Sequence, residues 1–328
     1  MSRSGTIRWG ILGAGYIAGE FVKDFAYLQR AELVAVAASE KSRAENFATQ
    51  HGIPHAFLYE ELYTSPLVDA VYIATTHNFH FEQVMACLNH GKAVLCEKPI
   101  TVNPEQFQQL CDKAREKNLF LMEAVWTWFL PAVQQVKSWI TDGRIGKLKM
   151  IQADFAFAAP YKPEGRLYNP HLAGGSLLDI GIYPIAMASF LMDGLPSAIH
   201  ATGNFTDTGV DESIAMLLDY GHCKAMLASS IASTMGNEWR IYGDAGSIVV
   251  PEFWKAKQAT LFNNDKQQID QFVDGRLSRG FIYEMQDATD AILEGRTQSE
   301  TVPWERSAWL QQIMMEVRKQ IGLIYPFE

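Results

Sequence analysis

The sequence predicts an α/β protein of two domains: an N-terminal doubly wound parallel sheet, followed by an α+β domain built on a large, mainly antiparallel sheet. Over residues 1–123, six short apolar strands alternate with helical segments, and a glycine-rich turn follows the first strand. Over residues 147–263, alternating apolar and polar segments are joined by short turns. The 328 residues also exceed what one ordinary core supports. We therefore expect domains at 1–123 and 124–328, and the last helix could pack back on the first domain.

The first strand, residues 6–12, leads directly into Gly13-Ala14-Gly15-Tyr16-Ile17-Ala18 and a helix expected from Ile17 to about Gln29. A GxGxxA pattern between a strand and a helix is typical of a dinucleotide-binding turn. Gly13 permits the tight turn, and Gly15 lets the backbone approach a pyrophosphate. The backbone amides of Tyr16 and Ile17, at the start of the helix, would attract the diphosphate.

The second strand, residues 33–38, ends in Ser39-Glu40-Lys41-Ser42-Arg43. Folds that prefer NAD place an acidic residue at this strand tip, where it binds the ribose hydroxyls. Here Ser39 occupies the tip, with Lys41 and Arg43 close behind, which suits a 2′-phosphate. The pattern favours NADP(H), while Glu40, one residue away, leaves NAD(H) open.

The rest of the first domain repeats the alternation of helix and strand. The expected elements are helix 41–51, strand 56–58, a short helix near 60, strand 69–74, helix 81–89, a strand containing the apolar run 93–95, a helix from 104 and strand 119–122. Lys98 ends the strand that contains 93–95, and Pro99 restricts its backbone away from the helical region. The ammonium would therefore project into the crevice where open α/β sheets bind ligands. For an isolated Glu-Lys-Pro, a surface lysine before a turn is the commoner meaning.

The chain resembles the glucose-fructose oxidoreductase, inositol dehydrogenase and rhizopine-catabolism (Gfo/Idh/MocA) family. The resemblance rests on residues 13–18, 71–76 and 91–99 and on His80. Segments 121–126 and 174–184 are similar to those of dimeric dihydrodiol dehydrogenases and NADP-dependent D-xylose dehydrogenases within that family. The resemblance covers essentially the whole chain. It implies an NAD(P)-dependent oxidoreductase, and cofactor contacts from Thr75, Thr76, His80, Glu97 and Lys98.

Asp179 and Tyr183 follow Gly174-Gly175 with a spacing that places both on one face of a helix. Taken alone, they would be a helix-start charge and a core aromatic. Hydride transfer at a carbinol carbon also moves a proton on its oxygen, which nicotinamide cannot supply. A tyrosine can act as base only if a cation stabilises its phenolate. We expect Tyr183 to be the general acid and base, Lys98 to lower its pKa and touch the nicotinamide ribose, and Asp179 to orient a substrate hydroxyl. The resemblance implies the same roles for Lys98 and Tyr183.

The second domain is expected to begin with a helix at 131–141 and a strand at 147–159. Further elements are a helix that follows Gly174-Gly175 and runs to about 191, strands at 198–206, 212–220, 223–232, 239–250 and 258–263, and helices at 280–294 and 303–321. One face of this sheet would pack on helices, and the other could form a homodimer or a higher homo-oligomer. Trp126, Phe155 and Trp254 are candidate substrate contacts, since aromatic faces suit a sugar ring or an arene diol. Each of them could equally be a core residue.

Composition excludes several other classes of protein. The net charge is −9, the pI is near 5.4 and no Lys/Arg block occurs, which argues against nucleic acid and anionic membranes as partners. We find no uninterrupted apolar run of about 18 residues and no signal-peptide pattern at residues 1–8, and we expect a cytoplasmic protein. The four cysteines, Cys87, Cys96, Cys111 and Cys223, form no CxxC pair. His77 and His80 lack further ligands nearby, so no metal is expected.

Two functions from different classes remain. The first is a dehydrogenase or reductase acting on a secondary alcohol or hemiacetal of a sugar, cyclic polyol or dihydrodiol. The second is a non-catalytic nucleotide sensor on the same fold, as some transcriptional regulators resembling this family are. The fold cannot separate them. The joint presence of Lys98, Asp179 and Tyr183 favours the enzyme, since a sensor needs no proton-transfer set.

Overall fold

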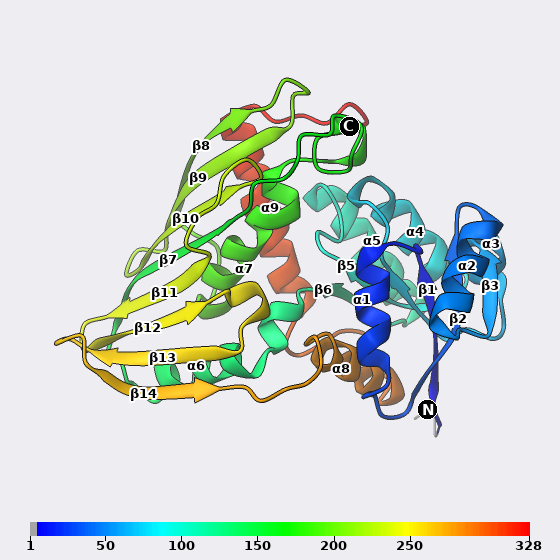
Figure 1. The fold of residues 1–328 in the computed structure, drawn as a ribbon, viewed down its shortest axis with the longest axis horizontal. Helices are drawn as coiled ribbons and strands as arrows, with labels where there is room; N and C mark the ends of the chain where they lie inside the picture. Colours follow the sequence, from blue (N-terminus) through cyan, green and yellow to red (C-terminus); the bar gives the residue numbers. More distant parts are fainter. Residues whose placement is uncertain (1–4) are drawn as a thin grey trace. The chain divides into compact units, whose positions relative to one another are not determined.

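The computed structural model describes residues 5–328, which form two compact units (Figure 1). The first unit runs up to Trp126 and also contains Leu277–Ser307; the second comprises Thr127–Arg276 and Ala308–Glu328. The sequence-based division at 123/124 assigned 277–307 to the second domain, and this segment packs within the first unit instead. The reason is a set of distant hydrogen bonds. The buried carboxylate of Asp24 accepts from the backbone amides of Arg279, Gly280 and Ile282, at 2.7, 2.8 and 3.2 Å.

The first unit is a six-stranded parallel sheet with the order β3-β2-β1-β4-β5-β6, which confirms the predicted doubly wound architecture. Its strands are β1 (Ile7–Leu12), β2 (Ala31–Ala38), β3 (His55–Leu58), β4 (Ala70–Ile73), β5 (Ala93–Glu97) and β6 (Leu121–Ala124). Its helices are α1 (Tyr16–Phe25), α2 (Lys41–His51), α3 (Tyr59–Thr64), α4 (His77–Asn89), α5 (Pro104–Lys117) and α8 (Ile282–Leu293). Strands β4 and β5 and the edge strand β6 are buried along their whole length, as expected for strands covered on both faces.

Two helix boundaries in this unit differ from prediction. Helix α1 ends at Phe25 rather than near Gln29, because the amides of Tyr27 and Leu28 bond to carbonyls only three residues back. Helix α4 begins at His77 rather than Phe81, since the chain turns into the helix directly after the extended residue Thr76. The first turn of α4 is mostly polar, so the spacing of apolar residues did not predict it.

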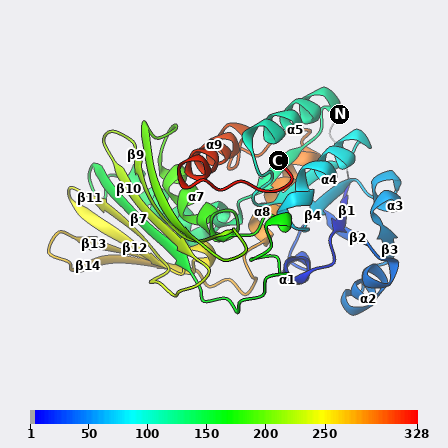
Figure 2. The ribbon, with the colours of Figure 1, turned by 90° about the horizontal axis from the view of Figure 1, so that it is seen from above.

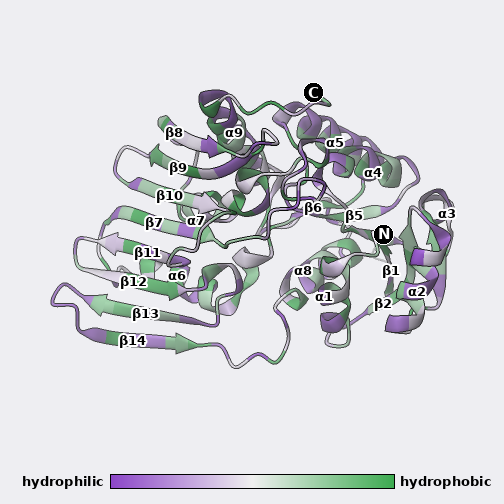
Figure 3. Cartoon of the chain, turned by 45° about the horizontal axis from the view of Figure 1, so that its top comes forward, coloured by the Kyte–Doolittle hydropathy of each residue, from purple (hydrophilic) through white to green (hydrophobic). Residues whose placement is uncertain are grey.

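The second unit is built on an eight-stranded sheet with the order β14-β13-β12-β11-β7-β10-β9-β8, in which only β7 and β10 pair in parallel. Its strands are β7 (Leu148–Ala156), β8 (Ala198–Phe205), β9 (Asp211–Asp219), β10 (Lys224–Ser230), β11 (Glu238–Gly243), β12 (Gly246–Pro251), β13 (Gln258–Asn263) and β14 (Gln268–Val273). Figure 3 shows hydrophobic and hydrophilic residues alternating along these strands. The predicted large, mainly antiparallel sheet is confirmed.

Two details of this sheet were predicted incorrectly. The single segment 239–250 is a hairpin of β11 and β12, because the chain reverses at Asp244-Ala245. Strand β14 was not predicted. It is an edge strand with no fully buried residue, so its sequence lacks the apolar alternation that marked the others.

Helices cover one face of this sheet (Figure 2). They are α6 (Pro131–Thr141), which contacts β13 and β14, α7 (Ile182–Leu191), which contacts β7 and β10, and the final α9 (Trp304–Ile321). Short helical turns η1 (Trp126–Phe129), η2 (Pro170–Leu172) and η4 (Phe253–Lys255) link the larger elements. One stretch of the described residues, Pro170–Leu191, is apolar and long enough to cross a membrane by composition. However, 89% of its apolar window is buried inside the protein, as in a core helix.

Candidate active site

The turn between β1 and α1 has the backbone that the glycine pattern predicted. Gly13 adopts φ 106°, and a Cβ there would lie 2.7 Å from the carbonyl oxygen of Ala74. A Cβ on Gly15 would meet nothing within 4 Å. Helix α1 then starts without a side-chain cap, and Tyr16 is 83% exposed, while Ile17 is half-buried. Uncapped amides facing open space fit the diphosphate of a dinucleotide.

The tip of β2 carries exposed cationic and hydroxyl groups. Ser39 and Arg43 are both exposed, whereas the ammonium of Lys41 lies 2.7 Å from a carboxylate oxygen of Glu61. Tyr59, at the start of α3, reaches this tip and was missed by the sequence analysis. Burial raises the pKa of Tyr59, while the charge of Arg43 and hydrogen bonding with Ser39 oppose the rise. Ser39, Arg43 and Tyr59 therefore form one small cluster, and Lys41 is engaged elsewhere.

The loop after β4 is held by its own side chains. The hydroxyl of Thr75 donates to Gln83 at 2.6 Å, and that of Thr76 donates to Asn78 at 2.8 Å. His80 is fully buried, with Nδ1 2.8 Å from the carbonyl oxygen of Pro99 and Nε2 3.2 Å from that of Thr75. Burial lowers the pKa of His80 to about 4, so the ring is neutral and its single N–H can serve one carbonyl. His80 ties this loop to the turn that follows β5 and exposes no surface to a ligand.

The Glu97-Lys98 pair ends β5 at the same carboxyl edge of the sheet. The carboxylate of Glu97 is buried and accepts from the hydroxyl of Tyr72 at 2.6 Å and from the amide of Lys98 at 3.2 Å. Tyr72 in turn stacks on Phe21, with 3.5 Å between ring centroids. Lys98 itself is half-buried. The backbone at Lys98 is thus fixed by packing from β4 and α1.

Asp179 and Tyr183 lie in the second unit, on the helix that follows Gly174-Gly175. Asp179 falls in a π-helical turn, η3 (Leu177–Gly181), and Tyr183 in the first turn of α7. The prediction of a helix here is confirmed, but its first turn is wider than an α-helix, a feature frequent at functional sites. The side chain of Asp179 is 9% exposed and pairs with Arg166 at 2.7 Å. No spacing signal in the sequence pointed to Arg166, which lies in an irregular loop.

Aromatic rings surround Tyr183 within the second unit. Phe155, on β7, meets the ring of Tyr183 edge-on, with 5.4 Å between centroids and 71° between planes. Phe155 also stacks on Trp254 at 4.1 Å and 16°. Two of the three predicted substrate contacts therefore lie together beside the predicted base. The third, Trp126, belongs to the first unit, where it is buried and stacks on Phe281 at 4.6 Å.

The start of the helix that carries Asp179 and Tyr183 is held by residues far along the chain. The amide of Leu177 donates to Asp211 Oδ2 at 2.6 Å, and a Cβ on Gly175 would lie 2.0 Å from Asp211 Oδ1. The hydroxyl of Tyr325 donates to the carbonyl oxygen of Gly174 at 2.8 Å. Asp211 is fully buried, and burial raises its pKa to about 7, against the lowering effect of its backbone hydrogen bonds.

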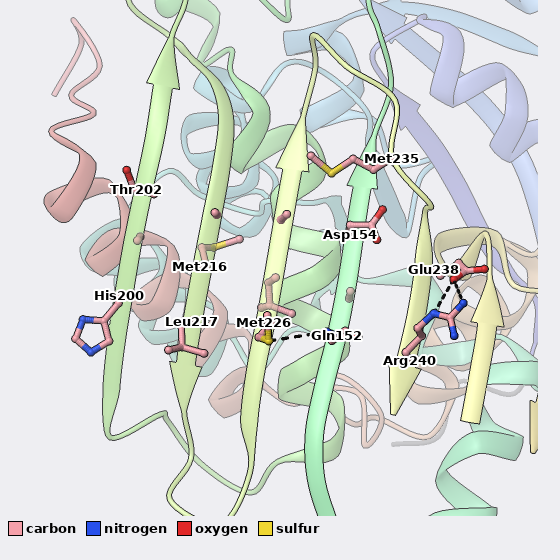
Figure 4. A pocket seen from close by; sticks show the side chains of 15 residues that line it. Gln152, Asp154, His200, Thr202, Met216, Leu217, Met226, Met235, Glu238 and Arg240 are labelled. Carbon is pink, nitrogen blue, oxygen red and sulfur yellow. Dashed lines mark hydrogen bonds and ion pairs between the residues drawn. The ribbon is translucent and has the colours of Figure 1, made fainter. Parts of the chain in front are cut away.

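A separate hollow of about 940 Å³ lies on the sheet face opposite to Phe155 (Figure 4). Strand alternation explains the separation, because the side chains of Gln152 and Asp154 point into the hollow, while Phe155, the next residue of β7, lies on the other face and contacts Tyr183 of α7. Its apolar floor includes Met226 and Leu217, and no lysine or tyrosine lines it. Within residues 5–328, no group of three or more His, Cys, Asp or Glu side chains could hold a metal ion, and all four cysteines are buried and free.

Family models match most of the chain. A model described as "Oxidoreductase family, NAD-binding Rossmann fold" matches residues 7–125, and one described as "GFO/IDH/MocA C-terminal domain" matches residues 133–249. Among curated relatives, trans-1,2-dihydrobenzene-1,2-diol dehydrogenase of Danio rerio is 37% identical over 330 residues, covering 97% of this chain and 98% of its own. The Homo sapiens protein of the same name is 36% identical and covers 98% of each chain.

Solved structures share the whole architecture. A 3-ketoreductase from Actinomadura kijaniata in complex with NADP and TDP-benzene superposes with a TM-score of 0.86 at 25% identity, covering 97% of this chain and 98% of its own. An aldose-aldose oxidoreductase from Caulobacter crescentus gives a TM-score of 0.88 at 22% identity, with the same coverage of both chains. The second similarity concerns the fold alone.

Proposed function

The chain belongs to the Gfo/Idh/MocA oxidoreductase family and is an NAD(P)-dependent dehydrogenase acting on CH–OH groups, and we propose that Tyr183 is its general acid and base, assisted by Lys98. The substrate carbon is a secondary alcohol or hemiacetal of a sugar, cyclic polyol or dihydrodiol. One observation carries the proposal: Tyr183 is a half-buried phenol that follows the Asp179–Arg166 pair along one helical segment and meets the aromatic ring of Phe155, which stacks on Trp254. The relatives named as dehydrogenases do not favour a non-catalytic sensor.

The roles of the side chains follow from their chemistry. The bound nicotinamide supplies the hydride acceptor or donor and no acid or base. Tyr183 exchanges a proton with the substrate oxygen, and the ammonium of Lys98 lowers the pKa of the phenol. Asp179 accepts a hydrogen bond from a substrate hydroxyl. Its pairing with Arg166 at 2.7 Å orients this carboxylate.

The aromatic wall supports a ring-shaped substrate. Phe155 and Trp254 are stacked with 16° between their planes, and such a surface packs against the apolar face of a sugar or of an arene diol. The curated relatives are named trans-1,2-dihydrobenzene-1,2-diol dehydrogenase, and the ketoreductase structure contains NADP and TDP-benzene. Trp126 completes the proposed set of ring contacts.

The cofactor preference proposed here is NADP(H) over NAD(H). Gly13, Gly15, Tyr16 and Ile17 would hold the diphosphate through the backbone, and Thr75, Thr76 and Glu97 would shape the nicotinamide end. Exposed Ser39 and Arg43 would bind the 2′-phosphate. The Arg43→Ala variant should lose most of the ratio of kcat/KM for NADP over that for NAD, while its kcat/KM with NAD stays near wild type. An unchanged ratio would show that Arg43 does not bind the 2′-phosphate of NADP.

The decisive test of the proposed function is Tyr183→Phe. Removing only the hydroxyl should lower kcat at least about 100-fold, the usual scale for a general acid or base. Turnover is followed by the absorbance of reduced nicotinamide, with a panel of aldoses, inositols and diols. The affinity for NADPH, measured by fluorescence, should change little. Wild-type turnover in this variant would refute the role of Tyr183.

The proposal extends to a homodimer formed by the uncovered face of the second unit's sheet. Met226 and Leu217 are 46% and 40% exposed on this face, and Glu238 pairs with Arg240 on β11, which is separated from the strand of Met226 by β7. An apolar floor with a charged rim suits a self-complementary contact. Sedimentation should give twice the chain mass, and Met226→Glu should shift it toward the mass of one chain.

A further inference from the structure

One buried carboxyl group near Lys98 has no role in the function proposed above. Glu123 lies on β6, directly opposite Cys96 of β5, and is 1% exposed. Its Oε1 accepts a hydrogen bond of 3.0 Å from the backbone amide of Ile100, two residues beyond Lys98. Its Oε2 is shut off from water and has no hydrogen-bond partner among the described residues. One oxygen of Glu123 therefore holds the turn after Lys98, and the other remains unsatisfied.

Charged and titratable groups face Glu123 from three elements. From β5 come Cys96 and Glu97, and Lys98 directly follows that strand; from α5 comes Cys111, and from α9 comes the hydroxyl of Ser307. Burial raises the pKa of Glu123 to about 7. The amide of Ile100, the hydroxyl of Ser307 and the charge of Lys98 act against this rise, while the charge of Glu97 adds to it. The group therefore changes its charge close to neutral pH.

We propose that Glu123 is the positioning residue of Lys98: it holds the Lys98-Pro99-Ile100 turn through the amide of Ile100, and its ionised form keeps Lys98 protonated. This inference rests on the proposed role of Lys98 as the cation that assists Tyr183. In a site with little water, a carboxylate near an ammonium favours the charged form of both groups. Above neutral pH, Glu123 therefore extends the range over which Lys98 carries its charge.

The matched variant is Glu123→Gln. The amide oxygen of glutamine can still accept from Ile100, so the turn keeps its hydrogen bond while the negative charge is lost. Removing the charge should lower the pKa of Lys98 by about one unit, the scale of a nearby opposite charge. A purely structural role would predict a loss of stability and no change in the titration of Lys98.

The primary measurement needs no substrate. With glutamate labelled by ¹³C at Cδ, one carboxyl resonance of the wild-type chain should titrate near pH 7 and be absent from the spectrum of Glu123→Gln. With lysines reductively methylated by ¹³C-formaldehyde, the Lys98 resonance is identified by its absence in Lys98→Arg. In the wild type, this resonance should show a second inflection near pH 7 as Glu123 ionises. Because the wild type supplies both curves, the test survives a variant that folds poorly.

The control is Glu284→Gln, on α8. Glu284 is also fully buried, with neither carboxyl oxygen hydrogen-bonded, but it acts on Glu97 and Asp287. This variant should leave the titration of Lys98 unchanged. The inference is overturned by a Glu123 carboxyl that titrates near 4.5, by a Lys98 curve without the inflection, or by equal shifts in the two variants.

Kinetics provide a second readout once a substrate is found. The pH profile of kcat should lose its inflection near pH 7 in Glu123→Gln, and its alkaline limb should begin about one pH unit lower. The KM for the substrate should change little, since the side chain of Glu123 is only 1% exposed and offers no surface to a ligand. If no compound is turned over at all, the proposed function fails, whereas the two NMR titrations still decide the role of Glu123.

Discussion

The two units hold their candidate site residues in different ways. In the first unit, the glycine turn, the threonines after β4 and Lys98 all follow the carboxyl ends of parallel strands, and most of their supporting contacts come from neighbouring strands and loops. In the second unit, Asp179 and Tyr183 sit on a helix whose start is held by Asp211 and Tyr325, which are 34 and 151 residues away in the chain from their partners.

The difference shows that the two units position their candidate site residues in two different ways. A parallel sheet aligns its strand ends without distant help, because every crossover returns the chain to the same edge. An antiparallel sheet with one helical layer has no such edge. The second unit therefore fixes the start of its site helix by buried polar contacts, which come from Asp211 and Tyr325. Backbone changes should therefore damage ligand binding in the first unit and folding in the second.

The largest effect is expected from Gly175→Ala. The residue has φ 116°, and its new Cβ would lie 2.0 Å from Asp211 Oδ1. Backbone strain and overlap together should cost roughly 5 kcal/mol in the free energy of unfolding, close to the whole margin of a domain. Denaturant unfolding, or failure to obtain folded protein, measures it. Gly209→Ala is the control, because φ is 90° there but no atom lies within 4 Å of the new Cβ. Equal losses of stability in the two variants would exclude the overlap with Asp211 as the cause.

The next effect concerns Asp211→Asn and its dependence on pH. Burial raises the pKa of Asp211 from 3.8 to about 7, so the folded chain binds more protons than the unfolded chain between these values. Its contribution to stability is therefore present at low pH and is lost as pH rises from about 4 to 7. Relative to wild type, Asp211→Asn should gain up to about 4 kcal/mol across this window. Urea unfolding at several pH values measures the difference between the two proteins, and a difference that is constant with pH would contradict the buried, protonated carboxyl.

The smallest effect is expected in the first unit, from Gly15→Ala. Its Cβ would meet nothing within 4 Å, and φ there is not positive, so thermal unfolding should match wild type. The methyl group would instead occupy the space in front of the uncapped amides of α1. The dissociation constant for NADPH should rise about tenfold, equivalent to about 1.4 kcal/mol. Unchanged binding would show that the diphosphate does not approach Gly15.

Much of the fold could be predicted because hydrophobic periodicity, and the glycines and prolines at the ends of helices and strands, are local features of the sequence. Helices α2 and α6 begin and end at the predicted residues, where apolar spacing, Gly52 and Pro131 mark their limits. Strand β14 and the reversal between β11 and β12 were missed, because exposed edge strands and tight turns leave little hydrophobic signal. The glycine-rich turn between β1 and α1 could be predicted in the same way, because the positive φ at Gly13 is a property of the local backbone and favours glycine.

The amino-acid sequence alone determined the class of each unit, the family, and the residue types at the proposed site, since these depend on spacing along the chain. Only the tertiary structure decided that Leu277–Ser307 joins the first unit, that Arg166 pairs with Asp179, and that Glu123 is buried and reaches the turn after Lys98. Burial and the approach of distant side chains set hydrogen bonding and pKa values. Neither has a periodic signature, so neither could be predicted before the chain was folded.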